Sequence, residues 1–121
     1  MRAFSVPTSA LLRYLARGGA APLPGVAAVS EVLDAREQGF LAQRAFPASV
    51  PGPSFLKAVA GPVPDVVFCP TGGITADSAA GCLAAPDAAC VGGSRLTPQD
   101  AVRDGDWERI TRLAAEAVAL R

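Results

Sequence analysis

The feature that most constrains this chain is the alternation of strand-like and helix-like segments along its 121 residues. Apolar runs such as Asp65–Pro70 and Ala88–Ser94 have the composition of strands that are buried on both faces. Helical spacing of apolar residues follows each such run. This alternation predicts an α/β fold of about four parallel strands in βαβ units. The other strand candidates are Arg2–Val6, Ala20–Val26 and Phe40–Ala48. The candidate Ala20–Val26 is weak because each of its two prolines removes a ladder donor.

Helix start and stop signals divide the segments between these runs. Ser54 and Asp106 stand where N-cap residues are expected, and Thr97 precedes a proline at the first position of a helical turn. In the segment after Ser54, helical spacing predicts that Leu56 and Val59 are buried and that Lys57 is exposed. The expected helices are Thr8–Gly19, Val29–Gly39, Ser54–Gly61, Thr75–Ala85 and the residues after Asp106.

The composition is that of one globular domain over residues 1–121. Half of the residues are hydrophobic, and 11 basic residues balance 11 acidic ones, so charge gives no reason to expect nucleic acid or an anionic membrane as partner. No apolar run approaches the roughly 20 residues of a membrane span. Arg13 and Arg17 interrupt the apolar residues near the N-terminus, which therefore does not resemble a signal peptide. We expect a cytoplasmic protein.

The sequence offers no usual set of metal ligands. Histidine is absent, and Cys69, Cys82 and Cys90 form no CxxC pair. Cys69 and Cys90 each lie in an apolar run, where cysteine behaves as a small buried hydrophobe. We therefore expect no metal site.

Two glycine pairs stand where an expected strand gives way to helical sequence. Gly72 and Gly73 follow one apolar run, and a second pair ending at Gly93 follows the next. Glycine allows backbone N–H groups to approach a ligand closely, and a helix N-terminus favours an anion such as phosphate. Thr71 and Ser94 would add hydroxyl donors. The alternative is that both pairs are ordinary turn residues.

Several segments resemble the 2-keto-3-deoxy-6-phosphogluconate (KDPG) aldolase family, which includes 4-hydroxy-2-oxoglutarate aldolase. They are "LPGVAAVSEVLDAREQGF", "FPAS", "GPSFLKAVAGP", "VVFCPTGGIT" and "CVGGSRLTPQDAVRDGDWERIT", with a fainter match at "AFSVPTSALLRYL". The resemblance covers nearly the whole chain and begins near the family's fifth strand. It implies parallel βα repeats like the second half, about strands 5–8, of a (β/α)8 TIM barrel.

The resemblance also implies an activity and a site. The family cleaves the phosphorylated sugar acid to pyruvate and glyceraldehyde 3-phosphate through an imine on a lysine, without metal or other cofactor. The substrate phosphate would be held by Gly72, Gly73, Gly93 and Ser94, with Thr71 at the end of the same strand. The expected ligand is thus a phosphorylated 2-keto sugar acid, or phosphate itself.

Arg44 occupies the position of the family's imine-forming lysine, three residues before the proline of the "FPA" motif. A guanidinium stays protonated and cannot become the required amine nucleophile. Three roles remain open for Arg44: binding a ligand carboxylate, forming a structural ion pair, or exposure because the strand has shifted. Lys57, the only lysine, is expected on the surface of a helix.

In the family, a proton-transferring glutamate lies on earlier strands that have no counterpart in this sequence, and the remaining acids do not replace it. Glu31 and Glu37 fall in an expected helix and Asp65 at the start of a strand, so we interpret them as solvated charges or helix-end partners. Pro51 stands where the family often has a second glycine, and this alters the loop after the "FPA" motif. The sequence alone does not decide whether Met1 is the biological start of the protein.

Half a barrel would leave two open sheet edges and one apolar face. We expect the chain to form a homo-oligomer or to pair with a chain that supplies the N-terminal half, unless the sheet flattens and its helices cover that face. Three functions compete: half of an aldolase-type lyase, a non-catalytic module that binds phosphorylated sugar acids, and a truncated remnant. Because of Arg44, we expect the isolated chain to be inactive in aldol cleavage.

Overall fold

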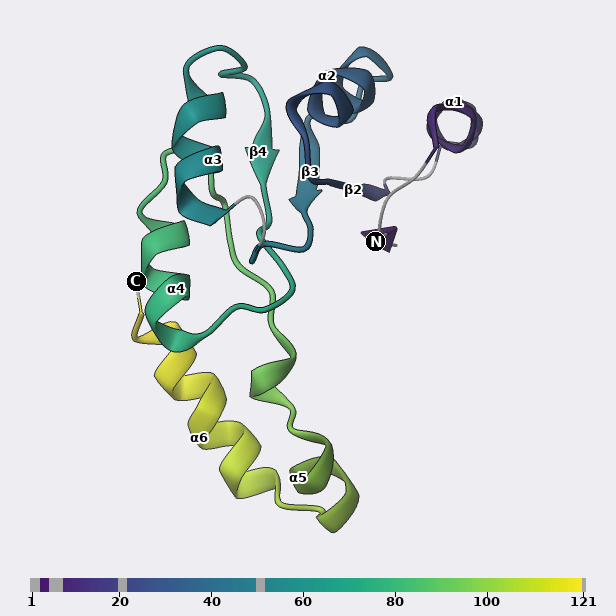
Figure 1. Cartoon of the computed structure of the whole chain (residues 1–121). Coiled ribbons are helices and arrows are strands. Elements are labelled where there is room, and N and C mark those ends of the chain that lie inside the picture. Colours follow the sequence, from purple (N-terminus) through teal and green to yellow (C-terminus); the bar gives the residue numbers. More distant parts are fainter. Residues whose placement is uncertain (1–2, 5–7, 20–21, 50–51, 121) are drawn as a thin grey trace.

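A computed structural model describes residues 3–4, 8–19, 22–49 and 52–120 of the chain. Within these residues, helices and strands alternate as the sequence predicts (Figure 1). The strands form a sheet in the order β1-β2-β3-β4, and each neighbouring pair is parallel. The predicted α/β class with parallel strands is therefore confirmed. The strands are β1 (Ala3–Phe4), β2 (Leu23–Val26), β3 (Ala42–Ala45) and β4 (Val67–Phe68).

Each of the four strands is followed by a helix, and two further helices, α5 and α6, complete the C-terminal part of the described chain. In Figure 1, α3 lies beside β4, α4 lies below α3, and α5 and α6 extend further down. No helix in the described ranges is long and apolar enough to cross a membrane. The helices are α1 (Ser9–Arg17), α2 (Val29–Glu37), α3 (Gly52–Ala60), α4 (Ala76–Leu83), α5 (Gln99–Asp104) and α6 (Trp107–Val118), with a 3-10 turn, η1, at Ser94–Leu96.

Helix capping agrees with the sequence in one case and differs in two. The Asp106 side chain accepts a hydrogen bond from the Arg109 N–H at 3.0 Å, as expected of an N-cap. Ser54 was expected to cap α3, but the helix begins two residues earlier, so Ser54 lies inside it. The helix α5 begins after Pro98, which takes the cap position itself in place of Thr97. Proline has no side-chain acceptor, so α5 begins without a side-chain cap.

The strand expected at Ala88–Ser94 is reduced to two isolated parallel bridges, Phe68 with Ala88 and Thr71 with Gly92. Between these bridges the chain after β4 advances by three residues and the facing chain by four. The register between the two segments therefore shifts by one residue, and a continuous ladder of hydrogen bonds cannot form. We call residues 88–92 the fifth extended segment.

The weak strand expected at Ala20–Val26 is an interior strand of the sheet. β2 pairs with β1 on one side and with β3 on the other. Pro22 precedes the strand, so Pro24 is the one proline inside it, and its ring is fully buried. A single proline removes only one ladder donor. The other strand residues maintain the pairing on both sides.

The hydrophobic core lies between the sheet and the helices α2, α3 and α4. Val26, Ala45 and Phe68 project into it from β2, β3 and β4, and each is only 1% exposed. The ring of Phe55 meets the ring of Phe68 edge to face, with 6.4 Å between centroids. Leu56 of α3 is also 1% exposed, as its helical position predicted. The helices contribute Val32, Ala35, Leu56, Val59 and Cys82 to this cluster.

The opposite face of the sheet is open at β3 and β4. Ala42 and Val67 face each other across these strands, and both are exposed, Val67 to 45%. The expectation that the apolar run Asp65–Pro70 is covered on both faces is thus wrong at Val67. The helices that contact β3 and β4 place their apolar side chains in the core on the other face. This part of the sheet therefore has one buried and one accessible face.

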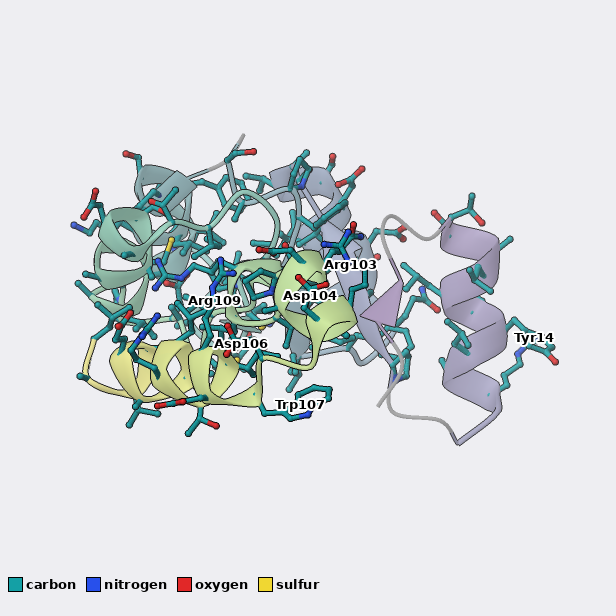
Figure 2. All side chains as sticks on the ribbon, turned by 90° about the horizontal axis from the view of Figure 1, so that it is seen from below. Tyr14, Arg103, Asp104, Asp106, Trp107 and Arg109 are labelled. Carbon is teal, nitrogen blue, oxygen red and sulfur yellow. The ribbon has the colours of Figure 1, made fainter. Side chains whose placement is uncertain are left out.

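The first helix is set apart from the rest of the molecule. In Figure 1 it lies beyond β2, and Figure 2 shows Tyr14 pointing away from all other elements. Leu12 is buried, and the Ser9 hydroxyl donates a hydrogen bond of 2.6 Å to the Asp34 carboxylate of α2. The helix α1 is thus attached mainly through α2. The strand residues expected at 2 and 5–6, and Pro51, lie outside the described residues.

Candidate anion-binding site

The two glycine pairs lie next to each other at the edge of the sheet where the strands end. Thr71 and Gly92 form a parallel bridge, and the Gly92 N–H donates a hydrogen bond of 2.8 Å to the Pro70 carbonyl oxygen. A Cβ atom added at Gly93 would lie 3.8 Å from the Cβ of Ile74. Residues 71–75, the first glycine loop, and residues 92–94, the second glycine loop, are therefore in contact. The family resemblance, which assigned residues of both loops to one phosphate, implied that the loops are close.

The first glycine loop has a backbone that favours glycine. Gly72 and Gly73 have φ values of +90° and +72°. A Cβ atom at Gly72 would come within 2.8 Å of the Phe46 ring, and one at Gly73 within 3.0 Å of the Ser49 Cβ. Both glycines are thus required by the backbone conformation and by close packing on the loop after β3. The Ala48 N–H strengthens that contact with a 2.8 Å hydrogen bond to the Thr71 carbonyl oxygen.

Backbone donors remain available at both loops. Within the described ranges, the N–H groups of Gly73, Gly93 and Ser94 have no protein acceptor. The first loop leads into α4, whose N-terminus is capped by Thr75 and Ser78: the Ser78 N–H donates to the Thr75 hydroxyl at 3.2 Å, and the Thr75 N–H donates to the Ser78 hydroxyl at 2.9 Å. Unpaired amides and the positive end of a helix favour a bound anion.

The two hydroxyl groups predicted at the site differ in their availability. The Thr71 hydroxyl donates to the Cys69 carbonyl oxygen at 3.1 Å and lies 3.7 Å from the Cys69 sulfur. Its proton is therefore already used within its own strand. Ser94 is exposed at the start of η1, and its side chain makes no hydrogen bond to other described residues. Ser94 is the freer donor of the two.

Arg44 lies on β3 with its side chain half-buried. Its guanidinium carbon lies 4.1 Å from the centroid of the Phe46 ring, the geometry of a cation–π contact. No carboxylate in the described part of the chain forms an ion pair with Arg44. The structural ion pair that we considered for this residue is thus not found among those residues.

The other charged residues discussed above lie away from the glycine loops. Asp65 pairs with Arg36, whose Nε lies 2.8 and 2.9 Å from the two carboxylate oxygens. The hydrogen bond from Arg36 lowers the pKa of Asp65 below its ordinary value. Glu31 accepts a hydrogen bond of 2.7 Å from the Ala27 N–H at the start of α2, so it serves that helix end. Lys57 is exposed on α3, as predicted.

Two buried polar side chains were not singled out by the sequence. Asp87 is 6% exposed, and neither of its carboxylate oxygens has a hydrogen-bond partner among the described residues. Burial raises the pKa of Asp87 above its ordinary value. Gln43 donates to the carbonyl oxygens of Val32 and Phe40 at 3.0 and 2.9 Å, but its own side-chain oxygen is unpaired. The signal for Asp87 was its position as the single acid in the small-residue stretch "AAPDAAC".

The cysteines differ from the prediction in their exposure. Cys90 is exposed and Cys69 half-buried, whereas Cys82 is buried. Cys90 contributes to an apolar cavity of about 430 Å³ between α4, the fifth extended segment and α6, and this position explains its exposure. The described residues contain no group of three or more cysteines and acids that could hold a metal ion.

The fold and these loops define an α/β protein of parallel βα units with two adjoining glycine loops at the ends of neighbouring strands. A model of the KDPG and KHG aldolase family matches residues 7–113. The chain belongs to this family. The resemblance found in the sequence is thereby confirmed.

Individual relatives support the same assignment. The chain is 45% identical over 113 residues to the 2-dehydro-3-deoxy-phosphogluconate aldolase of Pseudoalteromonas atlantica, covering 93% of this chain and 53% of that one. It is 42% identical over 112 residues to the KHG/KDPG aldolase of Escherichia coli, covering 92% and 53%. These relatives are aldolases, which are lyases.

Solved structures of aldolases superpose closely on the chain. The KDPG aldolase of Legionella pneumophila, crystallised with pyruvate captured as a covalent carbinolamine, aligns with a TM-score of 0.89 at 36% identity, over 95% of this chain and 56% of that one. The aldolase of Zymomonas mobilis with 3-phosphoglycerate aligns with a TM-score of 0.85 at 36% identity, over 98% and 56%. The chain thus spans about half the length of the relatives it matches.

Proposed function

We propose that this chain is a phosphate-binding portion of an aldolase-type barrel that does not by itself cleave a carbon–carbon bond. The observation that carries the proposal is the contact between the two glycine loops, which the Gly92 N–H and the Pro70 carbonyl oxygen join at 2.8 Å. The contact brings the unpaired N–H groups of Gly73, Gly93 and Ser94 to one edge of the sheet. The ligand would be phosphate or a phosphorylated 2-keto sugar acid, and Gly72 shapes the loop that binds it.

The described strands, in this proposal, correspond to the second half of a (β/α)8 barrel, and residues 1–121 form one partial-barrel domain. The open face at Ala42 and Val67 supports the proposal, because barrel strands turn one face to the helices and the other to the interior. Either a second copy of the chain or a polypeptide with the missing strands would close the sheet.

Arg44 is the main reason for proposing that the isolated chain does not catalyse aldol cleavage. By the family resemblance it stands at the imine-forming position, and its guanidinium does not provide a neutral amine. Lys57 lies on the exposed surface of α3. The identity of 45% to a named aldolase favours a second candidate, namely that the chain contributes to a lyase when assembled with the missing half.

A single backbone donor can be removed to test the phosphate site. Ser94 begins η1, and Gly93 before it has a ψ of 142°, so proline fits at position 94. Ser94→Pro deletes the hydroxyl and the N–H, whereas Ser94→Ala deletes the hydroxyl alone. Inorganic phosphate should stabilise the wild type and Ser94→Ala against thermal unfolding, and Ser94→Pro should show a smaller shift.

The comparison of these two variants isolates the N–H group, since neither has the hydroxyl. Unliganded unfolding temperatures serve as the control for proper folding. If phosphate stabilises Ser94→Pro as much as Ser94→Ala, the Ser94 N–H does not bind phosphate. If millimolar phosphate leaves even the wild type unshifted, the proposed function is wrong.

Assembly is tested separately by size-exclusion chromatography with light scattering. The accessible face and unpaired sheet edges should give a mass above that of one chain at micromolar concentration, or capture of a supplied chain with the missing strands. A monomer that remains monomeric in the presence of that chain would contradict the assembly.

A further inference from the structure

The direction of the Arg44 side chain follows from its place in β3. Its neighbours Gln43 and Ala45 are buried on the helix side of the sheet. Because side chains alternate along a strand, Arg44 points to the other face, the one that is open at Ala42. On β2, the residue in register with Arg44 is Gly25, which has no side chain to compete for space.

The register between β3 and β4 places Arg44 beside the first glycine loop. Backbone N–H groups of Cys69 and Thr71 continue the ladder past the strands with hydrogen bonds of 2.9 Å. This register sets Arg44 opposite Cys69 and Phe46 opposite Thr71. All four side chains share one face, as the 3.7 Å separation of the Cys69 sulfur and the Thr71 hydroxyl oxygen shows for two of them.

The Phe46 ring connects the guanidinium to the glycine loop. Arg44 lies over the ring at 4.1 Å, and the edge of the same ring comes within 2.8 Å of a Cβ position at Gly72. The contact with the ring limits the rotation of the guanidinium. The cation is thus positioned near the loop without an acidic partner in the described part of the chain.

We propose that Arg44 is a carboxylate-binding residue of this site, so that the chain selects phosphorylated acids over phosphate esters without a carboxylate. The inference rests on the phosphate site proposed above. The planar guanidinium has no counter-ion among the described residues, and a carboxylate can accept two parallel charge-assisted hydrogen bonds from it. The phosphate binds the glycine loops, and the carboxylate at the other end of the ligand binds Arg44.

Two probes that differ only at one carbon separate this inference from the phosphate site itself. Glycerol 3-phosphate carries a phosphate and a hydroxymethyl group, and 3-phosphoglycerate carries a carboxylate in place of the latter. Isothermal titration should show 3-phosphoglycerate binding about tenfold more tightly than glycerol 3-phosphate, as expected for a charged hydrogen-bonded pair. Arg44→Gln should reduce that ratio to near one.

Two further variants distinguish a specific contact from a general effect of charge. Arg95→Gln removes a cation next to the second glycine loop and should weaken both probes alike, leaving their ratio unchanged. Arg44→Lys retains a charge but not the planar pair of donors, so its ratio should be intermediate. Unfolding temperatures without ligand verify that each variant folds.

The outcomes separate the two proposals. If both probes bind the wild type with equal affinity, the phosphate site stands and the role of Arg44 is wrong. A ratio that Arg44→Gln leaves intact also overturns that role, because the preference for the carboxylate then comes from elsewhere. Failure of inorganic phosphate and of both probes to bind overturns the phosphate site and the inference together.

Discussion

Gly92 donates its backbone N–H to the carbonyl oxygen of Pro70 across 2.8 Å, and this bond joins two loops that lie about twenty residues apart in the sequence. Neither residue has a side chain that could bind a ligand through hydrogen bonding. Their contribution is to fix the relative position of the N–H groups that follow each of them. The geometry of the candidate site therefore depends more on backbone register than on side-chain chemistry.

The first prediction concerns Gly72. Replacement by alanine forces a side chain onto a backbone with φ of +90° and brings the new Cβ within 2.8 Å of the Phe46 ring. Gly72→Ala should lower the free energy of unfolding by about 1–3 kcal/mol and abolish the stabilisation by phosphate. Chemical denaturation with and without phosphate measures both effects.

Gly61→Ala is the matched control for that substitution. Gly61 is exposed, and a Cβ atom there would have no neighbour within 4 Å. Its stability should change by less than about 1 kcal/mol, and phosphate should still stabilise it. Equal losses in the two variants would show that Gly72 has no special conformational requirement.

The second prediction concerns imine chemistry. Borohydride reduction in the presence of pyruvate traps an imine between the keto acid and a protein amine. The intact-protein mass of the wild type should stay unchanged, since Arg44 cannot form an imine and Lys57 lies on the surface. A stable adduct would contradict the proposed inactivity. Its loss in Lys57→Arg would assign it to Lys57, and its persistence would point to the N-terminal amine.

The third prediction uses the N-terminal cap of α4. The Thr75 hydroxyl accepts a hydrogen bond from the Ser78 N–H at 3.2 Å, and the Thr75 N–H donates one to the Ser78 hydroxyl at 2.9 Å. Thr75→Ala should reduce the free energy of unfolding by about 1 kcal/mol. Thr111→Ala removes an exposed hydroxyl from the middle of α6 and serves as comparison. A Thr75→Ala protein as stable as the wild type would show that the cap is dispensable.

The fourth prediction concerns Asp87 and pH. Burial raises its pKa in the folded state above the ordinary value of 3.8. The folded protein then retains this proton more tightly than the unfolded chain does, so the stability contributed by this group is complete below pH 3.8 and is lost as the pH rises through the folded-state pKa. Asp87→Asn should therefore raise the unfolding temperature at neutral pH and remove this loss.

Asp104→Asn provides the control, because Asp104 is exposed on α5. The carboxylates of Asp65 and Asp100 act in the opposite direction, since hydrogen bonds from arginines lower the pKa of each and their contribution is lost on acidification. Unfolding curves of the wild type and both variants from acidic to neutral pH are thus required. If the stability of Asp87→Asn changed with pH in parallel with that of the wild type, ionisation of the buried Asp87 carboxyl would not be the cause of the loss.

Local pattern was sufficient for the helices and for the contact between the glycine loops. The period of α3 predicted that Leu56 is buried and Lys57 exposed, and Asp106 was recognised as a cap from its neighbours. The two loops meet because parallel strands end at the same edge of a sheet, which follows from the alternation of elements alone.

The remaining features depend on the tertiary structure. The exposure of Cys90 and Val67 reflects which helices cover each segment, and apolar composition contains no information about that. The interrupted pairing near Gly92 arises from a difference in residue spacing between two distant segments. The lack of a partner for Asp87 likewise becomes visible only when all its neighbours are placed.

The bridge between Thr71 and Gly92 has one more consequence. The first glycine loop packs on the loop after β3 and is bridged to the second glycine loop, so three segments that are distant in the sequence set its conformation. A substitution in the loop after β3 can therefore change the shape of the first glycine loop without altering any residue of that loop. A fragment that lacked β3 and the loop after it would lose the packing partners that shape the first glycine loop.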